Sequence, residues 1–242
     1  MGTPLEGKVA IVTGGSRGIG FAIAAALLRN GTHVAISGVN KDHLEKAEAD
    51  LTRVAAAGAR VLIFSADVRD HLAVESLIDE TARRQGGLDI LVNNAGVGWF
   101  GSLESQGHDE WRRVMDTNVT GIFNCCKAAI PHLRRRGGGY IINISSLAGS
   151  NPFVGGVSYC ASKAAVDAFS EALMQEVRHD GIRVSYVKPG SVNTDFMGHA
   201  DPENDWKLRA DDVAQVVVDL VSHDQRSLPS RVEMRPSRPP KK

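Results

Sequence analysis

The chain has 242 residues, of which 43% are apolar and 23% are charged, a composition typical of folded globular proteins and not of disordered ones. Its 28 basic and 28 acidic residues balance, so the charge favours neither nucleic acid nor an anionic membrane as a partner. No apolar run is long enough for a membrane-spanning helix, and residues 1–7 are too polar for a secretory signal, so we expect a cytoplasmic protein.

The cysteines are few and irregularly spaced. Cys125, Cys126 and Cys160 are odd in number, and neither a Cys-x-x-Cys nor a Cys/His ligand spacing occurs. This pattern predicts no disulfide framework and no metal site. We expect all three side chains to act as small apolar groups of the core.

Short apolar runs rich in β-branched residues alternate with longer segments of helical periodicity. In chain order, strands are expected at 9–13, 33–37, 60–65, 88–92, 140–145 and 183–187, with a weaker seventh at 231–234. Helices are expected at 19–30, 42–57, 71–85, 111–136, 158–180 and 211–223. Gly31 and Gly58 would close the first two helices, whereas Gly121 and Pro131 predict a kink or a break within 111–136.

Strands that alternate with helices predict right-handed β-α-β units. The expected fold class is therefore α/β: a single-domain, Rossmann-type, doubly wound parallel sheet of about seven strands with helices on both faces. We expect one domain over 1–242, with an extended tail over 236–242. In such a sheet the ligand crevice lies beyond the carboxyl ends of the strands. Function is therefore expected in the loops that begin at Thr13, Ser37, Ala66, Asn93, Ser145 and Lys188.

A glycine-rich turn follows the first expected strand. Gly14, Gly18 and Gly20 have the spacing G-x-x-x-G-x-G. Glycine removes the steric limit on φ and lets a pyrophosphate approach the backbone, and the next helix offers its unpaired N–H groups to that phosphate. Gly20 would let the helix pack close to the strand. Tight packing alone is the other explanation of these glycines, so the turn by itself is a weak signal of nucleotide binding.

The glycine spacing resembles that of the short-chain dehydrogenase/reductase family, and the other motifs of that family follow in order up to about residue 194. They are Asp67-Val68, Asn93-Asn94-Ala95-Gly96, Asn118 in Thr-Asn-Val-Thr-Gly, Ser146, the Y-x-x-x-K pair Tyr159 and Lys163, and Lys188-Pro189-Gly190 through Thr194. The resemblance implies a nicotinamide cofactor bound by Gly14, Ser16, Arg17, Gly18, Ile19, Gly20, Asp67, Val68, Asn94, Ala95, Gly96, Tyr159, Lys163, Pro189, Gly190, Val192 and Thr194.

Tyr159 and Lys163 are four residues apart on an expected helix, so they share one face. A free tyrosine has a pKa near 10, too high for a base at neutral pH, and a neighbouring ammonium group would lower it. The resemblance implies that Tyr159 exchanges the proton, that Ser146 binds the substrate oxygen and that Asn118 anchors a water. Ser145 is the rival of Ser146, and the 13-residue spacing to Tyr159 favours Ser146.

The cofactor is expected to be NADP(H) in preference to NAD(H). The second strand ends in Ser37-Gly38-Val39-Asn40, without the acid that would bind a ribose 2′-hydroxyl, and Arg17 could pair with a 2′-phosphate. The absence of a second arginine at Val39 counts against this preference.

The substrate is expected to be a small ketone, aldehyde or secondary alcohol, held by apolar side chains of loops that include a substrate loop at about 191–210. These side chains are Val97, Trp99, Phe100, Leu147, Phe153, Phe196 and Met197. A 3-oxoacyl-[acyl-carrier-protein] reductase is the alternative, although residues 230–236 depart from the usual ending of those enzymes. A non-catalytic cofactor-binding sensor, or an epimerase or dehydratase, is a less favoured interpretation. The resemblance also implies a homotetramer or dimer, formed through 111–136 and 158–180.

Overall fold

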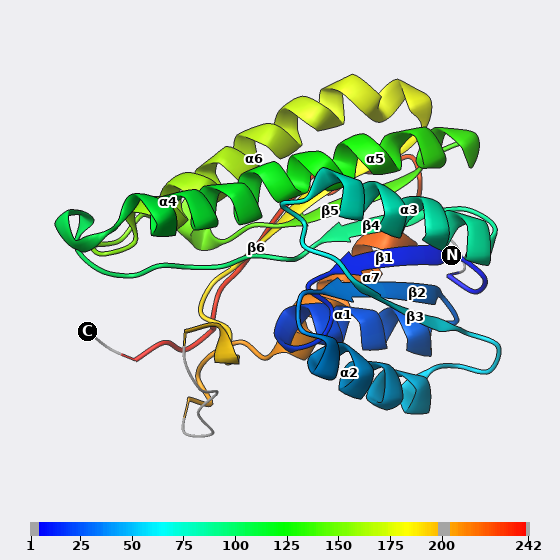
Figure 1. The fold of residues 1–242 in the computed structure, drawn as a ribbon, viewed down its shortest axis with the longest axis horizontal. Coiled ribbons are helices and arrows are strands. Elements are labelled where there is room, and N and C mark those ends of the chain that lie inside the picture. The colour runs from blue at the N-terminus through cyan, green and yellow to red at the C-terminus, as the bar shows by residue number, and fades with distance from the viewer. Residues whose placement is uncertain (1–4, 198–203, 241–242) are drawn as a thin grey trace.

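The computed structural model of the chain, which describes residues 5–197 and 204–240, is built on one seven-stranded sheet (Figure 1). All strand pairs are parallel and the order is β3-β2-β1-β4-β5-β6-β7, so the topology reverses between β1 and β4. The strands are β1 (Val9–Thr13), β2 (His33–Gly38), β3 (Val61–Ser65), β4 (Ile90–Asn93), β5 (Gly139–Ile144), β6 (Ile182–Pro189) and β7 (Arg231–Met234).

Helices cover both faces of the sheet, and each face has its own apolar core (Figure 1). The face of α1 and α7 buries Ala10 and Val12 of β1, whereas Ile11 between them points into the other cluster, with α3, α5 and α6. This alternation explains why the strands are continuous apolar runs. The helices are α1 (Gly18–Arg29), α2 (Lys41–Val54), α3 (His71–Gln85), α4 (His108–Met115), α5 (Gly121–Arg135), α6 (Val157–Val177) and α7 (Ala210–Ser222).

The predicted α/β sheet is confirmed, and most element boundaries differ from the predicted ones by one or two residues. Three boundaries differ by three residues: α4 begins at His108 and not at 111, α6 ends at Val177 and not at 180, and α2 ends at Val54 and not at 57. Ala55 is extended, and the amide of Ala56 donates to the carbonyl of Leu28 at the end of α1, 3.0 Å away. A tertiary hydrogen bond thus takes the chain out of the helix before Gly58, which lies in the following turn with φ +84°.

The long helical segment expected at 111–136 is interrupted neither at Gly121 nor at Pro131. The irregularity is a π-helical turn, Asp116–Thr120, between α4 and α5, and the backbone stays in the right-handed helical region on both sides of it. Gly121 instead allows close packing, since a Cβ there would lie 2.6 Å from a methyl group of Val68. Pro131 stands inside α5.

The cysteines behave as expected of core residues. Cys125, Cys126 and Cys160 are all buried free thiols, and burial raises the pKa of Cys125 to about 12. Within residues 5–197 and 204–240, no helix combines the length and the apolar character needed to cross a membrane.

Candidate active site

The glycine-rich turn joins β1 to α1 at the point where the sheet topology reverses. Gly14 and Gly18 have φ of +63° and +56°, which side chains rarely adopt. Gly20 is required for space, because a Cβ there would lie 2.3 Å from the Gly14 carbonyl oxygen and 2.4 Å from Nδ2 of Asn94. The turn is therefore a backbone cradle, lined by Gly14, Ser16, Arg17, Gly18, Ile19 and Gly20.

Hydrogen bonds tie this cradle to the end of β4. The Thr13 hydroxyl accepts from the amides of Asn94 and Ala95 at 3.0 and 3.1 Å. The Asn94 side chain donates to the carbonyls of Thr13 and Gly14 at 2.9 and 3.1 Å. The Asn-Asn-Ala-Gly segment and the glycine turn are consequently held together across the switch point of the sheet.

The end of β2 borders the same cradle. The Gly15 amide donates to the Ser37 carbonyl at 3.1 Å, and a Cβ on Gly38 would lie 3.4 Å from the Ser16 hydroxyl. Beyond it, Val39 is 71% exposed, and Arg17 of the glycine turn is exposed as well. The first turn of α1 contains no acidic residue to oppose an anion.

Asp67 and Val68 follow β3. Asp67 pairs with Arg69 at 2.5 Å, and hydrogen bonds from Arg69 hold the pKa of the Asp67 carboxyl below its usual range. The side chain of Asp67 is partly exposed, whereas Val68 is buried against Gly121 of α5. Asp67 is thus a partly exposed carboxylate beyond the end of β3.

Asn118 lies in the π-helical turn between α4 and α5 and is completely buried. Its side chain accepts from the Val97 amide at 2.8 Å, and donates to the Val97 carbonyl at 2.9 Å and to the Ser162 hydroxyl at 3.0 Å. A Cβ on Gly96 would lie 3.3 Å from Oδ1 of Asn118 and 3.7 Å from Nζ of Lys163. Gly96 therefore leaves room beside both groups.

Tyr159 stands in the first turn of α6, with its ring in an aromatic cluster. The ring centroids of Phe100 and Phe196 lie 5.5 and 5.7 Å from that of Tyr159, and Phe153 stacks on Phe100 at 6.1 Å. Burial raises the pKa of Tyr159, and a hydrogen bond with the Ser146 side chain opposes that rise. The Tyr159 hydroxyl and Ser146 therefore lie together.

Lys163, one turn further along α6, is buried. Its ammonium group donates to the Ile144 carbonyl at 2.8 Å and lies 5.8 Å from the centroid of the Tyr159 ring. Burial lowers the pKa of Lys163 to about 8, and the nearby Asp167 carboxylate opposes this effect. A protonated Lys163 would stabilise negative charge on Tyr159.

The two candidate serines have different environments. Ser145 is buried and donates to Asp167 at 2.5 Å, away from Tyr159. Ser146 accepts from the Ala148 amide at 3.1 Å and is the serine that bonds Tyr159. This geometry favours Ser146 over Ser145 as the group beside the substrate oxygen.

The segment after β6 faces the glycine turn. A Cβ on Gly18 would lie 3.7 Å from the Thr194 methyl group, so the two loops face each other. The Gly190 amide donates to the Met234 carbonyl at 2.8 Å, next to Pro189, and Val192 bridges to Leu208. Part of the expected substrate loop, 198–203, lies outside the described residues.

Sequence reasoning missed a buried polar cluster behind this site. Lys188 is completely buried at the end of β6 and pairs with Asp167 of α6 at 2.5 Å. A lysine near the end of a strand expected in the middle of a parallel sheet was the available signal, because a buried ammonium group needs a buried partner. Ser162, the partner of Asn118, was also missed.

Comparison with known proteins agrees with this geometry. The family model described as short chain dehydrogenase matches residues 8–205. Over 225 residues the chain is 39% identical to glycine betaine reductase ATRR of Emericella nidulans, and the match covers 89% of this chain but only 18% of that much longer protein. It is 38% identical over 208 residues to the 3-oxoacyl-[acyl-carrier-protein] reductase FabG of Chlamydia muridarum, covering 85% of this chain and 83% of the relative.

A solved structure has the same fold over nearly the whole chain. The alcohol dehydrogenase from the archaeon Thermococcus sibiricus, complexed with 5-hydroxy-NADP, has a TM-score of 0.88 at 30% identity, and the match covers 97% of this chain and 99% of the other. The chain therefore belongs to the short-chain dehydrogenase family, the NAD(P)-dependent oxidoreductases that act on CH–OH groups.

Proposed function

We propose that this chain transfers a hydride between NADP(H) and a ketone or aldehyde, or a secondary alcohol in reverse, with Tyr159 as the general acid and base. The observation that carries the proposal is the meeting of Tyr159, Ser146 and Lys163 beside the carboxyl end of β5, on the same edge of the sheet as the glycine turn. A proton donor, an oxygen-binding hydroxyl and a cation thus lie together.

The residues fit a dinucleotide. The glycine turn has no Cβ where a pyrophosphate would approach, and the adjacent end of α1 presents unpaired amides without an opposing acid. Gly190, Val192 and Thr194, in the segment that faces the turn, would hold the nicotinamide half. Asp67, Asn94 and Gly96 would hold the adenine half. The bound cofactor supplies or accepts the hydride, and the protein supplies position and proton.

The proton chemistry follows from the environment of Tyr159. In the reductive direction its hydroxyl donates a proton to the carbonyl oxygen, while Ser146 hydrogen-bonds the same oxygen. Lys163 would hold the ribose hydroxyls and favour the phenolate through its charge. Because burial lowers the pKa of Lys163 to about 8, this charge is present at neutral pH and is lost above it. Asn118 would anchor a water that links Lys163 to solvent.

The proposed preference for NADP(H) rests on the end of β2 and on Arg17. Val39 is 71% exposed and no acid stands between Ser37 and Asn40, so nothing in that segment repels a 2′-phosphate. Arg17 is exposed at the start of α1, where its side chain can approach such a phosphate. A kcat/KM for NADPH below that for NADH would overturn this preference.

The proposed substrate is an apolar carbonyl compound. Phe100, Phe153 and Phe196 line the surroundings of Tyr159, and all three contact it directly or through one ring. Val97, Trp99 and Leu147 belong to the same loops. The likeness to a 3-oxoacyl-[acyl-carrier-protein] reductase keeps a β-ketoacyl thioester as the second candidate substrate.

The chain is also proposed to be one cytoplasmic domain that assembles as a homotetramer or dimer. Trp111 of α4, Phe123 of α5 and Val157 of α6 are exposed apolar side chains on the helices expected at the interface. Size-exclusion chromatography with light scattering tests this, and a monomer would overturn it.

The activity is tested by following NADPH oxidation at 340 nm over aromatic and aliphatic ketones, aldehydes, quinones and acetoacetyl thioesters. We expect the fastest turnover with ring-bearing ketones or aldehydes. Turnover confined to the thioesters would favour the second candidate. NADPH binding without oxidation of any substrate class would identify a sensor, and conversion without net cofactor change would identify an epimerase or dehydratase.

A further inference from the structure

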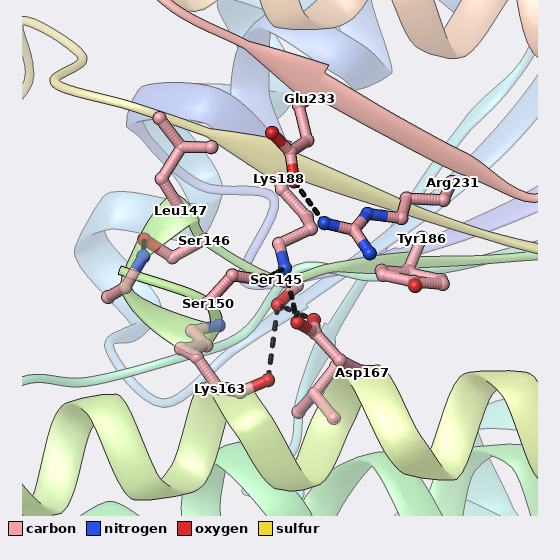
Figure 2. A network of polar contacts seen from close by, with 12 residues as sticks. Ser145, Ser146, Leu147, Ser150, Lys163, Asp167, Tyr186, Lys188, Arg231 and Glu233 are labelled. Carbon is pink, nitrogen blue, oxygen red and sulfur yellow. Dashed lines mark hydrogen bonds and ion pairs between the residues drawn. The ribbon is translucent and has the colours of Figure 1, made fainter. Parts of the chain in front are cut away.

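A buried ion pair between Asp167 and Lys188 lies near Ser146 and Lys163 (Figure 2). Lys188, near the end of β6, is completely buried, and its ammonium group donates to one carboxylate oxygen of Asp167 at 2.5 Å and to the hydroxyl of Ser150. The other carboxylate oxygen of Asp167 accepts from the Ser145 hydroxyl at 2.5 Å. Ser145 also lies 3.3 Å from the Lys163 carbonyl oxygen.

This cluster joins the three segments that carry the proposed chemistry. Ser145 immediately precedes Ser146 at the end of β5. Asp167 follows Lys163 by one turn on the same face of α6. Lys188 immediately precedes Pro189 and the loop proposed to hold the nicotinamide. A shift of any one segment would therefore break a buried, charge-assisted contact to another.

Stability alone is a weak reason for such a pair. Removing two charges from water is energetically costly, and apolar residues of similar volume often stabilise a fold as well or better. Ile182 and Val184, which lie on the same face of β6 as Lys188, are buried in the apolar cluster beneath α6. A methionine at 188 would suit this core, so the lysine calls for another explanation.

We propose that Asp167 and Lys188 are positioning residues, which fix Ser146, Lys163 and the Pro189–Gly190 segment relative to one another and set the electrostatic field at Lys163. The inference rests on the proposed function, because it assigns the pair to the same reaction. Neither residue touches the reacting atoms in this arrangement.

The field at the site comes from a small set of charged and titratable groups. Asp167 faces Lys163 on its own helix. From the sheet, Tyr186 and Lys188 of β6 and Arg231 of β7 face the same carboxylate. Lys188 faces Asp167, the Tyr186 ring at 5.9 Å, and Glu233 of β7. Glu233 in turn pairs with Arg231 and Arg235, and the Tyr186 hydroxyl donates to Glu171 of α6 at 2.9 Å. Lys163 itself faces Tyr159 and Asp167.

The signs follow from these charges. Asp167→Asn removes a negative charge beside Lys163, which lowers the pKa of Lys163 and of Tyr159. Lys188→Met removes a positive charge from the same region, which raises the pKa of both. The alkaline limb of kcat/KM for NADPH should therefore move by about one pH unit, downward in the first variant and upward in the second. A purely structural role would not move the limb in opposite directions.

The experiment compares wild type, Asp167→Asn, Lys188→Met, the double variant, and Asp50→Asn as a control at an exposed ion pair on α2. We expect each single variant to melt earlier and to lose roughly tenfold or more in kcat, with the dissociation constant of NADPH changed less than about threefold. The double variant should recover the wild-type melting temperature and the wild-type position of the alkaline limb of kcat/KM, but not the wild-type kcat. Asp167→Glu, which keeps the carboxylate, should recover part of the rate.

The proposal would be overturned by a wild-type kcat in the double variant. It would also be overturned if the alkaline limbs of the two single variants stayed at the wild-type pH or moved in the same direction. If a single variant does not fold, the double variant and Asp167→Glu still decide it. Failure of the proposed function would look different: wild type itself would oxidise no NADPH with any substrate. The pair would then be tested by the melting temperatures and by the pH dependence of NADPH binding, in which the opposite shifts should persist.

Discussion

The two halves of the sheet prepare their ligand sites by different means. On the β1–β3 side the cradle is made of backbone, and its decisive feature is the missing side chain at Gly14, Gly18 and Gly20. On the β4–β6 side the site is made of buried polar side chains, Asn118, Lys163 and Lys188 among them. Substitutions in the first half should therefore act by steric clash, and substitutions in the second half by a change of charge.

The largest effect should come from Lys163→Met in the charged half. Loss of the ammonium group removes both the charge beside Tyr159 and the donor proposed for the ribose. We expect kcat/KM for NADPH to fall by about 10³-fold. Steady-state kinetics with saturating carbonyl substrate measure this. A loss of kcat/KM below tenfold would show that catalysis at the β4–β6 side does not depend on the charge of Lys163.

Gly20→Ala tests the steric half. The new methyl group would meet the Gly14 carbonyl and the Asn94 side chain, so the turn must distort. We expect the free energy of unfolding to drop by about 1–3 kcal/mol and NADPH binding to weaken strongly, without any change in the shape of the pH profile. Denaturant melts and NADPH fluorescence titration provide both readouts. Wild-type affinity in this variant would contradict the role given to the turn.

Arg17→Ala should have a smaller and more selective effect. If Arg17 pairs with a 2′-phosphate, its loss weakens NADPH binding by about tenfold and leaves NADH binding nearly unchanged. Val39→Asp, at the exposed end of β2, should shift preference further towards NADH by repelling the phosphate. Equal losses for both cofactors in Arg17→Ala would remove the basis for the preference.

The smallest expected effect is on the pH dependence of stability, which tests the charged half without an activity measurement. The lysine of the unfolded chain keeps its proton up to about its ordinary pKa of 10.5, whereas the pKa of folded Lys163 is about 8. Between these values the unfolded chain binds the extra proton, so this group makes the fold more stable as pH rises across the window. The melting temperature of wild type should rise relative to that of Lys163→Met from pH 8 to pH 10. A constant difference would contradict the lowered pKa.

Sequence patterns predicted the fold well because they are local. The β1 run Val9–Thr13 and the α3 segment His71–Gln85 have the observed boundaries, since apolar periodicity reports directly which faces are buried. The end of α2 was misplaced because it depends on a hydrogen bond from Ala56 to Leu28, distant in sequence.

The candidate site was predictable where its motifs are contiguous and not where its contacts are distant. The spacing of Tyr159 and Lys163 placed them on one helix face, and the structure brings Ser146 to the same point. The partner of Lys188 lies 21 residues away on another element, so no spacing pointed to Asp167. The rings of Phe100 and Phe196 meet Tyr159 from separate loops, and their packing depends on the fold.

The most direct test of the central claim is the turnover of Tyr159→Phe with NADPH and the best carbonyl substrate of the panel. The substitution removes one hydroxyl and keeps the ring among Phe100, Phe153 and Phe196. We predict that kcat falls by at least about 10²-fold while NADPH affinity stays nearly intact. Normal turnover in this variant would contradict the assignment of Tyr159 as the proton donor.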